Sequence, residues 1–272
     1  MRRCRKMGFF TRESPVEKEW RRLLREEQRF LQKRLEKNPS HFQKKLEEKV
    51  PQKLQSALDT AFSKAFALIF EKGTGLVEKT YSRQKLEQEY QVRQYTLRIK
   101  QDSKSLRSFS KTVRSTSAKN TLLSGASGIG MGTLGIGLPD IPIFTGMLLK
   151  NLYEIALHFG YGYETKEERY FILLLIQGAV SNGETFLETD QKLSQFIRSG
   201  KLPDGYEEKN QMAKTAEALS KELLYLKFLQ GVPLVGAVGG AYDAVYMKQI
   251  AVYAGIKYRR RHLAEEGSLP WA

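Results

Sequence analysis

The chain contains 272 residues, enough for one large domain or two small ones with a buried core. Lysine and arginine outnumber aspartate and glutamate by 45 to 30, which gives a formal net charge of +15 at pH 7. A single cysteine, Cys4, excludes a disulfide scaffold and a cysteine-based zinc site, and the three histidines lie too far apart to suggest metal ligation: His41, His158 and His262. The charge excess instead predicts an anionic neighbour, either a membrane surface or nucleic acid.

The positive charge is concentrated in the first part of the chain. Residues 1–121 hold 30 basic and 14 acidic residues, a net charge of +16, so the remainder is nearly neutral. Residues 1–13 form a basic tail that lacks the apolar core of a signal peptide, and we therefore expect the chain to stay in the cytoplasm. A short basic cluster near the C-terminus provides candidate contacts for an anionic surface: Arg259, Arg260 and Arg261.

Helical periodicity runs through most of the chain. A first helix is expected to begin at residues 14–17, where Ser14 and Glu17 form a capping box around a proline. One face of this helix carries four apolar residues and one glutamate: Trp20, Leu23, Leu24, Glu27 and Leu31. Further helices are expected within residues 51–69, 83–99, 102–114, 140–159, 165–176 (with a second capping box at 165–168), 190–197, 206–229 and from 233 to the arginines. Strand patterns are absent from the sequence, which predicts an all-α, multi-helix domain.

Two glycine-rich, apolar segments stand out from this helical pattern. The first covers residues 120–139, which contain no charged side chain, and it leads into a Pro-Asp-Ile-Pro turn at residues 139–142. The second covers residues 231–243. Both have small residues four positions apart, which allows two helices to approach closely: Gly128 and Gly132 in the first, Gly236 and Gly240 in the second. We expect either a tight helix crossing inside a soluble core or two helical hairpins that dip into a bilayer or lie on it.

Few groups in these segments could perform chemistry. Asp140 and Asp243 would form a buried carboxylate pair, able to bind a cation or to act in hydrolysis, if the two segments pack together. Glu154 lies about 21 Å along the helix axis from Asp140 at ~1.5 Å per residue, too far to join that pair. The structural alternative is that Asp140 caps a helix and Asp243 pairs with Lys248 or a tyrosine. A G-x-G-x-x-G match at residues 130–135 lacks the flanking strand and helix of a dinucleotide site, so no cofactor is expected.

A known family combines the same features. The glycine stretch at residues 125–137 continues into the Pro-Asp-Ile-Pro turn and the helix of residues 148–156, and the second glycine stretch leads to Tyr242-Asp243. Together these segments resemble the EcsC protein family over roughly residues 14–262. The resemblance implies a membrane-proximal setting, since bacterial members lie beside an ABC transporter operon, and it implies no reaction and no catalytic residue. This span and the loss of charged residues after Lys119 suggest a division into four parts: residues 1–13, 14–119, 120–262 and 263–272, with 14–262 folding as one cooperative domain.

These observations favour a non-enzymatic accessory protein at the inner face of the cell membrane, associated with an ABC transporter or a secretion-related complex. The basic surface would attract anionic lipid and the glycine-rich hairpins would add apolar burial. Two alternatives from other classes remain open. One is a hydrolase or cation-binding protein that uses Asp140 and Asp243, and the other is sequence-independent nucleic-acid binding by the basic N-terminal half.

Overall fold

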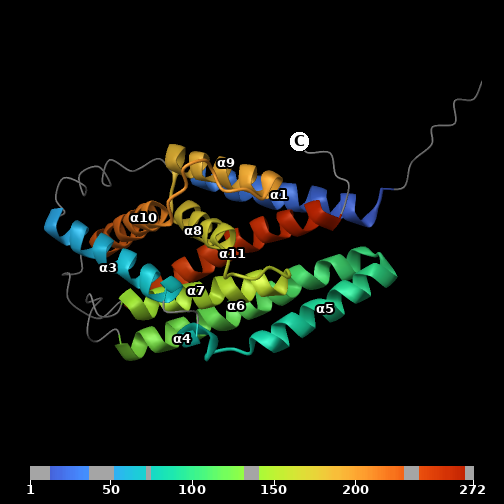
Figure 1. Cartoon of the computed structure of the whole chain (residues 1–272), viewed down its shortest axis with the longest axis horizontal. Helices are drawn as coiled ribbons and strands as arrows, with labels where there is room; N and C mark the ends of the chain where they lie inside the picture. The colour runs from blue at the N-terminus through green and yellow to red at the C-terminus, as the bar shows by residue number, and fades with distance from the viewer. Residues whose placement is uncertain (1–12, 37–51, 72–74, 132–140, 230–238, 267–272) are drawn as a thin grey trace, which may run out of the picture.

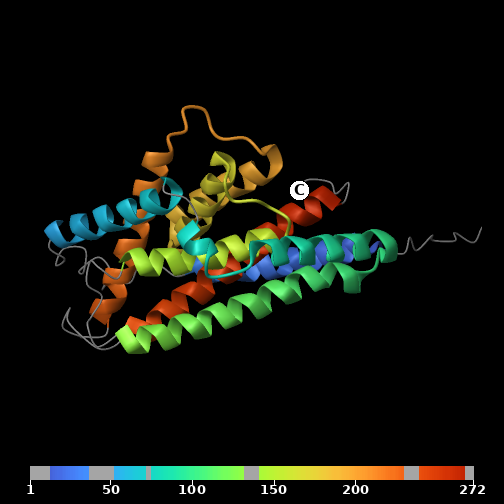
Figure 2. The ribbon, with the colours of Figure 1, turned by 60° about the horizontal axis from the view of Figure 1, so that its bottom comes forward.

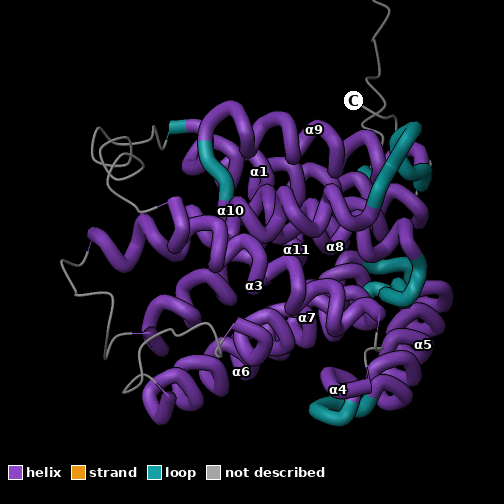
Figure 3. Tube along the Cα trace, turned by 60° about the vertical axis from the view of Figure 1, so that its left-hand side comes forward, coloured by secondary structure: helices purple, strands orange, loops and turns teal. Residues whose placement is uncertain are grey.

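The structure is a computed structural model that describes residues 13–36, 52–71, 75–131, 141–229 and 239–266 (Figure 1). This part of the chain is helical and contains no strand, which confirms the all-α class (Figure 3). The helices, in chain order, are α1 (Pro15–Leu35), α3 (Gln52–Glu71), α4 (Gly75–Glu78), α5 (Arg83–Lys100), α6 (Ser103–Met131), α7 (Ile141–His158), α8 (Lys166–Val180), α9 (Gly183–Ser199), α10 (Glu208–Leu229) and α11 (Gly239–Glu266).

The start of α1 confirms the first predicted capping box. The Ser14 side chain accepts a hydrogen bond from the backbone N–H of Glu17, and the Glu17 carboxylate accepts one from the backbone N–H of Ser14 at 2.7 Å. Two otherwise unpaired backbone donors are thereby satisfied, which fixes the first turn. At the second predicted box, Thr165 caps α8 by accepting from the Glu168 N–H, while the Glu168 carboxylate engages α11.

Two helices are longer than their sequence patterns predict. The helix expected to end near Arg114 continues as α6 to Met131, through three glycines of the first glycine-rich segment. Each glycine costs a helix about 1 kcal/mol relative to alanine, but small residues allow close packing, and α6 packs along α11 over most of its length (Figure 2). Similarly, the short helix expected at residues 190–197 is the full-length α9.

Helix α11 is the centre of the molecule (Figure 1). It contacts α1, α6, α7, α8 and α9, and its buried residues lie around most of its circumference. Tyr253 and Tyr258 are fully buried there. Tyr253 is stacked on a ring of α1 and tilted against one of α9. Tyr258 is stacked on Phe159, just beyond α7, and meets a ring of α8 edge-on. Helix α8 adds a continuous buried stretch from Tyr170 to Ile176. The core is therefore built mainly by α7, α8 and α11.

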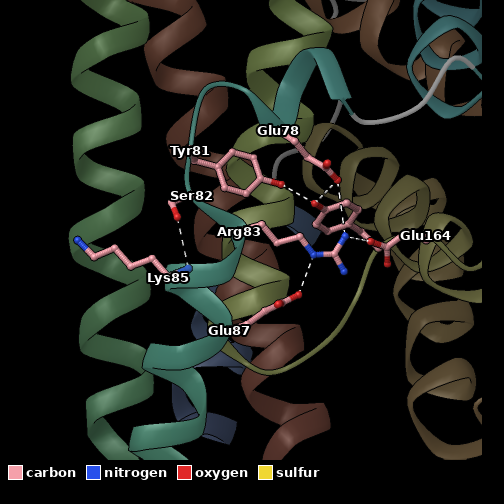
Figure 4. A network of polar contacts seen from close by, with 8 residues as sticks. Glu78, Tyr81, Ser82, Arg83, Lys85, Glu87 and Glu164 are labelled. Atoms are coloured by element: carbon pink, nitrogen blue, oxygen red, sulfur yellow. Dashed lines mark hydrogen bonds and ion pairs between the residues drawn. The ribbon is translucent and has the colours of Figure 1, made fainter.

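The α4–α5 region is clamped to the α7–α8 loop by a network around Arg83 (Figure 4). The Arg83 guanidinium pairs with Glu87 at 2.7 Å and also with Glu164, and it lies over the ring of Tyr163. The Tyr163 hydroxyl donates to Glu78 at 2.6 Å and accepts from Tyr81 at 2.8 Å. The surrounding carboxylates raise the pKa of Arg83 despite its partial burial. Because the polar groups of this network bind one another, its role is to hold the α4–α5 region against the α7–α8 loop.

Candidate functional site

The buried charges of α11 are the most prominent polar feature of the core. Lys257 is completely buried, and its Nζ lies 2.5 Å from Glu27 Oε1 and 2.6 Å from Asp190 Oδ1. Arg260 contacts the same Glu27 oxygen at 3.0 Å, and the Tyr253 hydroxyl donates to Asp190 at 2.6 Å. We call these five residues the Lys257 cluster. Burial would raise the pKa of Glu27, but the charges of Lys257 and Arg260 outweigh it and hold the pKa below its usual value. The cluster ties α1 and α9 to α11.

The three arginines predicted to meet an anionic surface are internal counterions. Arg259 pairs with Glu26 at 2.6 Å, and Arg260 belongs to the Lys257 cluster. Arg261 pairs with Glu168 at 2.6 Å and lies over the Tyr161 ring at 3.9 Å from its centroid. Arg259 is only 7% exposed. The expectation that this trio forms an exposed patch for an anionic membrane surface loses its basis, because their charges neutralise buried or half-buried glutamates.

Glu154 is placed in a small polar contact between α6 and α7. It is 6% exposed and accepts a hydrogen bond from Asn120, which also donates to Asn151 at 3.3 Å. Burial raises the pKa of Glu154 above its usual value, although the Asn120 hydrogen bond and Lys150 act in the opposite direction. One turn further along α7, burial and the Arg93 charge lower the pKa of His158 to about 4, so its ring is neutral at pH 7. These groups join helices and form no catalytic arrangement with one another.

The other predicted site residues belong to the glycine-rich segments. Asp140, Gly132 and Gly236 lie outside the described residues, so the carboxylate pair stays a prediction. Gly128 lies near the end of α6, and Gly240 and Asp243 lie in the first turns of α11. Across the described ranges, no group of three or more His, Cys, Asp or Glu residues could hold a metal ion.

The ends of α6, α7 and α11 that border the glycine-rich segments gather at one end of the molecule. Helix α6 finishes there, α7 and α11 begin there, and the three helices pack against one another (Figures 1 and 2). We call residues 120–131, 141–149 and 239–247 the helical tip. The only Asp, Glu, Lys or Arg in these three ranges is Asp243. The two glycine-rich segments, which the sequence predicted to pack together, thus adjoin helix ends that lie side by side.

The helical tip carries exposed apolar side chains and a basic border. Ile143 on α7 is 48% exposed and Val245 on α11 is 55% exposed. The first lysine beyond the tip on each helix is Lys119, Lys150 or Lys248, of which Lys119 and Lys248 are exposed and Lys150 is half-buried. An apolar end followed by a basic border is the surface pattern of proteins that rest in a membrane interface.

An apolar groove of about 600 Å³ runs between α6 and α11 and is closed on one side by α1. Its wall combines small and branched apolar side chains with two serines and four charged residues: Glu26, Ser110, Val113, Arg114, Ser117, Ala118, Lys248, Ala251, Val252, Gly255, Ile256 and Arg259. The volume lies within the roughly 300–1,000 Å³ range of small-molecule sites, which are mostly apolar with a few placed polar groups. Periodicity alone did not reveal this groove, because it depends on which faces of α6 and α11 meet.

Comparison with known proteins places nearly the whole chain in one family. The model of the EcsC protein family matches residues 16–263. No curated protein and no solved structure matches the chain. Among the described helices, none combines the length and the apolar character needed to cross a membrane.

Proposed function

The chain belongs to the EcsC protein family, and we propose that it is a non-enzymatic accessory protein that inserts its helical tip into one leaflet at the inner face of the cell membrane. There it would assist a membrane complex such as an ABC transporter or a secretion-related complex. The observation that carries this proposal is that the ends of α6, α7 and α11 gather at one end of the molecule (Figure 2). Asp243 is the one charged residue in the three ranges of the helical tip, and a lysine follows each range on its helix.

The dimensions of the tip suit one leaflet. From Lys119 to the end of α6 there are 12 residues, and from the starts of α7 and α11 to Lys150 and Lys248 there are nine on each helix. At ~1.5 Å per residue these distances are about 18 Å and about 13.5 Å. One leaflet of a bilayer contributes about 15 Å of hydrocarbon. A tip inserted to the level of the lysines would therefore reach about to the bilayer midplane, with the starts of α7 and α11 just short of it and the end of α6 just past it.

The energetics favour a mixed mode of binding. Each lysine near an anionic leaflet contributes about 1 kcal/mol, a contribution that salt screens. Burial of Ile143 and Val245, which are about half exposed in the isolated protein, adds about 0.8 kcal/mol per buried methylene, independent of salt. Asp243 is the one charge in the tip and opposes insertion unless it is neutralised or faces the helices. We therefore expect Asp243→Asn to bind membranes at least as well as the native chain.

Flotation with liposomes tests the proposal. The native chain should float with vesicles that contain anionic lipid, and part of the bound fraction should persist at high salt. Ile143→Asp with Val245→Asp should remove the salt-resistant part, because charged side chains in hydrocarbon are costly. Lys119→Gln with Lys150→Gln should remove part of the salt-sensitive binding.

A matched control uses a second exposed apolar surface. Val92 and Tyr95 on α5 are 66% and 67% exposed, more than either tip residue, and they lie away from the tip. Val92→Asp with Tyr95→Asp should leave flotation unchanged. Loss of flotation in the α5 variant but not in the tip variant would overturn the proposed orientation. Absence of flotation with retention on nucleic acid would favour the nucleic-acid alternative instead.

A further inference from the structure

The groove between α6 and α11 ends at an arrangement of charges that is not neutral. Arg114 and Arg259 lie on opposite walls, and both pair with Glu26, at 2.8 Å and 2.6 Å. Two guanidinium groups thus share one carboxylate. The two arginines outweigh burial and lower the pKa of Glu26, so it is ionised at pH 7. This end of the groove therefore carries one net positive charge.

Arg259 also retains hydrogen-bonding capacity. Its side chain is 8% exposed, and its Nε has no hydrogen-bond partner within the part of the chain that the structure describes. Its Nη2 binds Glu26, and its Nη1 donates to the Ser110 hydroxyl at the long distance of 3.4 Å. A guanidinium carries five N–H donors, so Arg259, which lines the groove, keeps donor capacity for an additional anionic acceptor.

Between this end and Lys248, which lines the other end beside the helical tip, the groove is mostly apolar. Val113 and Ala118 of α6 face Ala251, Val252 and Ile256 of α11 across it. Gly255 has no side chain to fill the groove, and a methyl group at this position would meet Val113 at 3.5 Å. The lining runs along α11 from Lys248 to Arg259, a length of about 16 Å at ~1.5 Å per residue. The groove is therefore a trough with a mostly apolar length, with Arg114, Arg259 and Glu26 at one end and Lys248 at the other.

We propose that this groove binds one long-chain fatty acid, with its carboxylate at Arg114 and Arg259 and its alkyl chain along α6 and α11. A carboxylate would neutralise the net charge left by the two arginines and Glu26, and its two oxygens suit guanidinium donors. At about 30 Å³ per carbon, close to the volume of one water molecule, a 16-carbon chain needs roughly 500 Å³. The groove, at about 600 Å³, accommodates one such chain, whereas a two-chain phospholipid needs about twice that volume. This inference does not depend on membrane insertion.

Calorimetric titration of the full chain with palmitate, below its aggregation concentration, tests the proposal. We expect one palmitate per chain and at least tenfold weaker binding of hexadecanol, which has the same chain without the carboxylate. Ala118→Phe places a ring in the groove from an exposed position and should weaken palmitate binding at least tenfold. Arg114→Gln should weaken it about tenfold, because it removes one of the two cationic partners of the carboxylate. The matched control, Val92→Phe on α5, should bind like the native chain.

A second measurement separates loss of binding from loss of folding. Palmitate should raise the melting temperature of the native chain and of Val92→Phe, because a ligand of the folded state stabilises it by mass action. Ala118→Phe should melt like the native chain without ligand and show no rise with palmitate. Equal binding of palmitate and hexadecanol, undiminished binding by Ala118→Phe, or stronger binding of a two-chain anionic phospholipid would each overturn the proposal.

Discussion

Replacement of Lys257 by methionine tests whether the buried charges hold α11 in place. Methionine fills a similar volume but leaves Glu27 and Asp190 without the ammonium group that lies 2.5 Å and 2.6 Å from them. Removal of one partner from a buried ion pair typically costs about 3–5 kcal/mol. Glu27 keeps Arg260 and Asp190 keeps the Tyr253 hydroxyl, so we expect the lower end, about 3 kcal/mol. For a chain of this size that corresponds to about 6–12 °C in melting temperature.

The pH dependence provides a more specific signature. In the native chain the pKa of Glu27 is lowered, so its contribution to stability is present above the unfolded pKa of about 4.3 and is lost as pH falls through the folded pKa. In Lys257→Met one of the two cations that lower the pKa of Glu27 is gone, so the effect of burial increases and the pKa rises. The free-energy difference between the native chain and Lys257→Met should therefore be largest at pH 7.5 and shrink toward pH 5.

Urea unfolding at several pH values measures this difference directly. Lys192→Met, on the exposed surface of α9, is the matched control and should change the free energy of unfolding by less than about 0.5 kcal/mol. A loss of unfolding free energy below about 1 kcal/mol in Lys257→Met, or a loss that does not change with pH, would refute the reasoning. Removal of a buried ammonium group from two buried carboxylates should destabilise the fold by more than that.

Two further predictions concern packing and burial in the same core. Gly178→Ala should destabilise the fold by about 1–3 kcal/mol in thermal unfolding, because a Cβ there would lie 3.0 Å from the Tyr253 ring. Gly146→Ala should stabilise α7 by up to about 1 kcal/mol, because a Cβ there would meet nothing within 4 Å. Glu154→Gln should match the native chain near pH 4 and be more stable at pH 7.5. The reason is that the raised pKa of Glu154 favours folding of the protonated form below the unfolded pKa, an advantage lost as pH rises toward the folded value; equal urea midpoints at both pH values would contradict it.

The local elements of this fold were accessible from the sequence because their signals are local. The capping box at Ser14 and the cap at Thr165 depend on neighbouring residues and occur where predicted. The extent of α6 was not accessible, because glycine propensity argues for an early end, and it is contact with α11 that extends the helix. The all-α class and the family were likewise readable from the pattern.

The buried charges show why the site was harder to predict. Glu27 was the one charged residue in the apolar stripe of the first helix, and that irregularity marked a buried carboxylate. Its partner Lys257 lies seven residues after Ile250 and four after Tyr253, on a buried face of α11, a spacing that could have identified it. What the pattern could not reveal is the pairing itself, because Glu27 and Lys257 are 230 residues apart and meet only through tertiary packing.

For the three arginines of α11, the sequence pattern predicted exposure where the structure shows buried or half-buried side chains. A run of three basic residues predicts an exposed patch when each is counted only by charge. On a central helix, however, successive residues point in different directions, and Arg259, Arg260 and Arg261 each reach a different glutamate. Exposed charge on this protein must therefore be sought at positions such as Lys119 and Lys248, which border the helical tip.

The depth of the helical tip in a bilayer tests the central claim most directly. With Cys4 replaced by serine, Val245→Cys and Tyr95→Cys each introduce a single attachment point for an environment-sensitive fluorophore. With anionic vesicles, the account predicts a blue-shifted emission at position 245 that is quenched by spin labels on the lipid chains, and no change at position 95. A protein that floats with vesicles while position 245 stays in water, or while position 95 is the one quenched, would contradict the account.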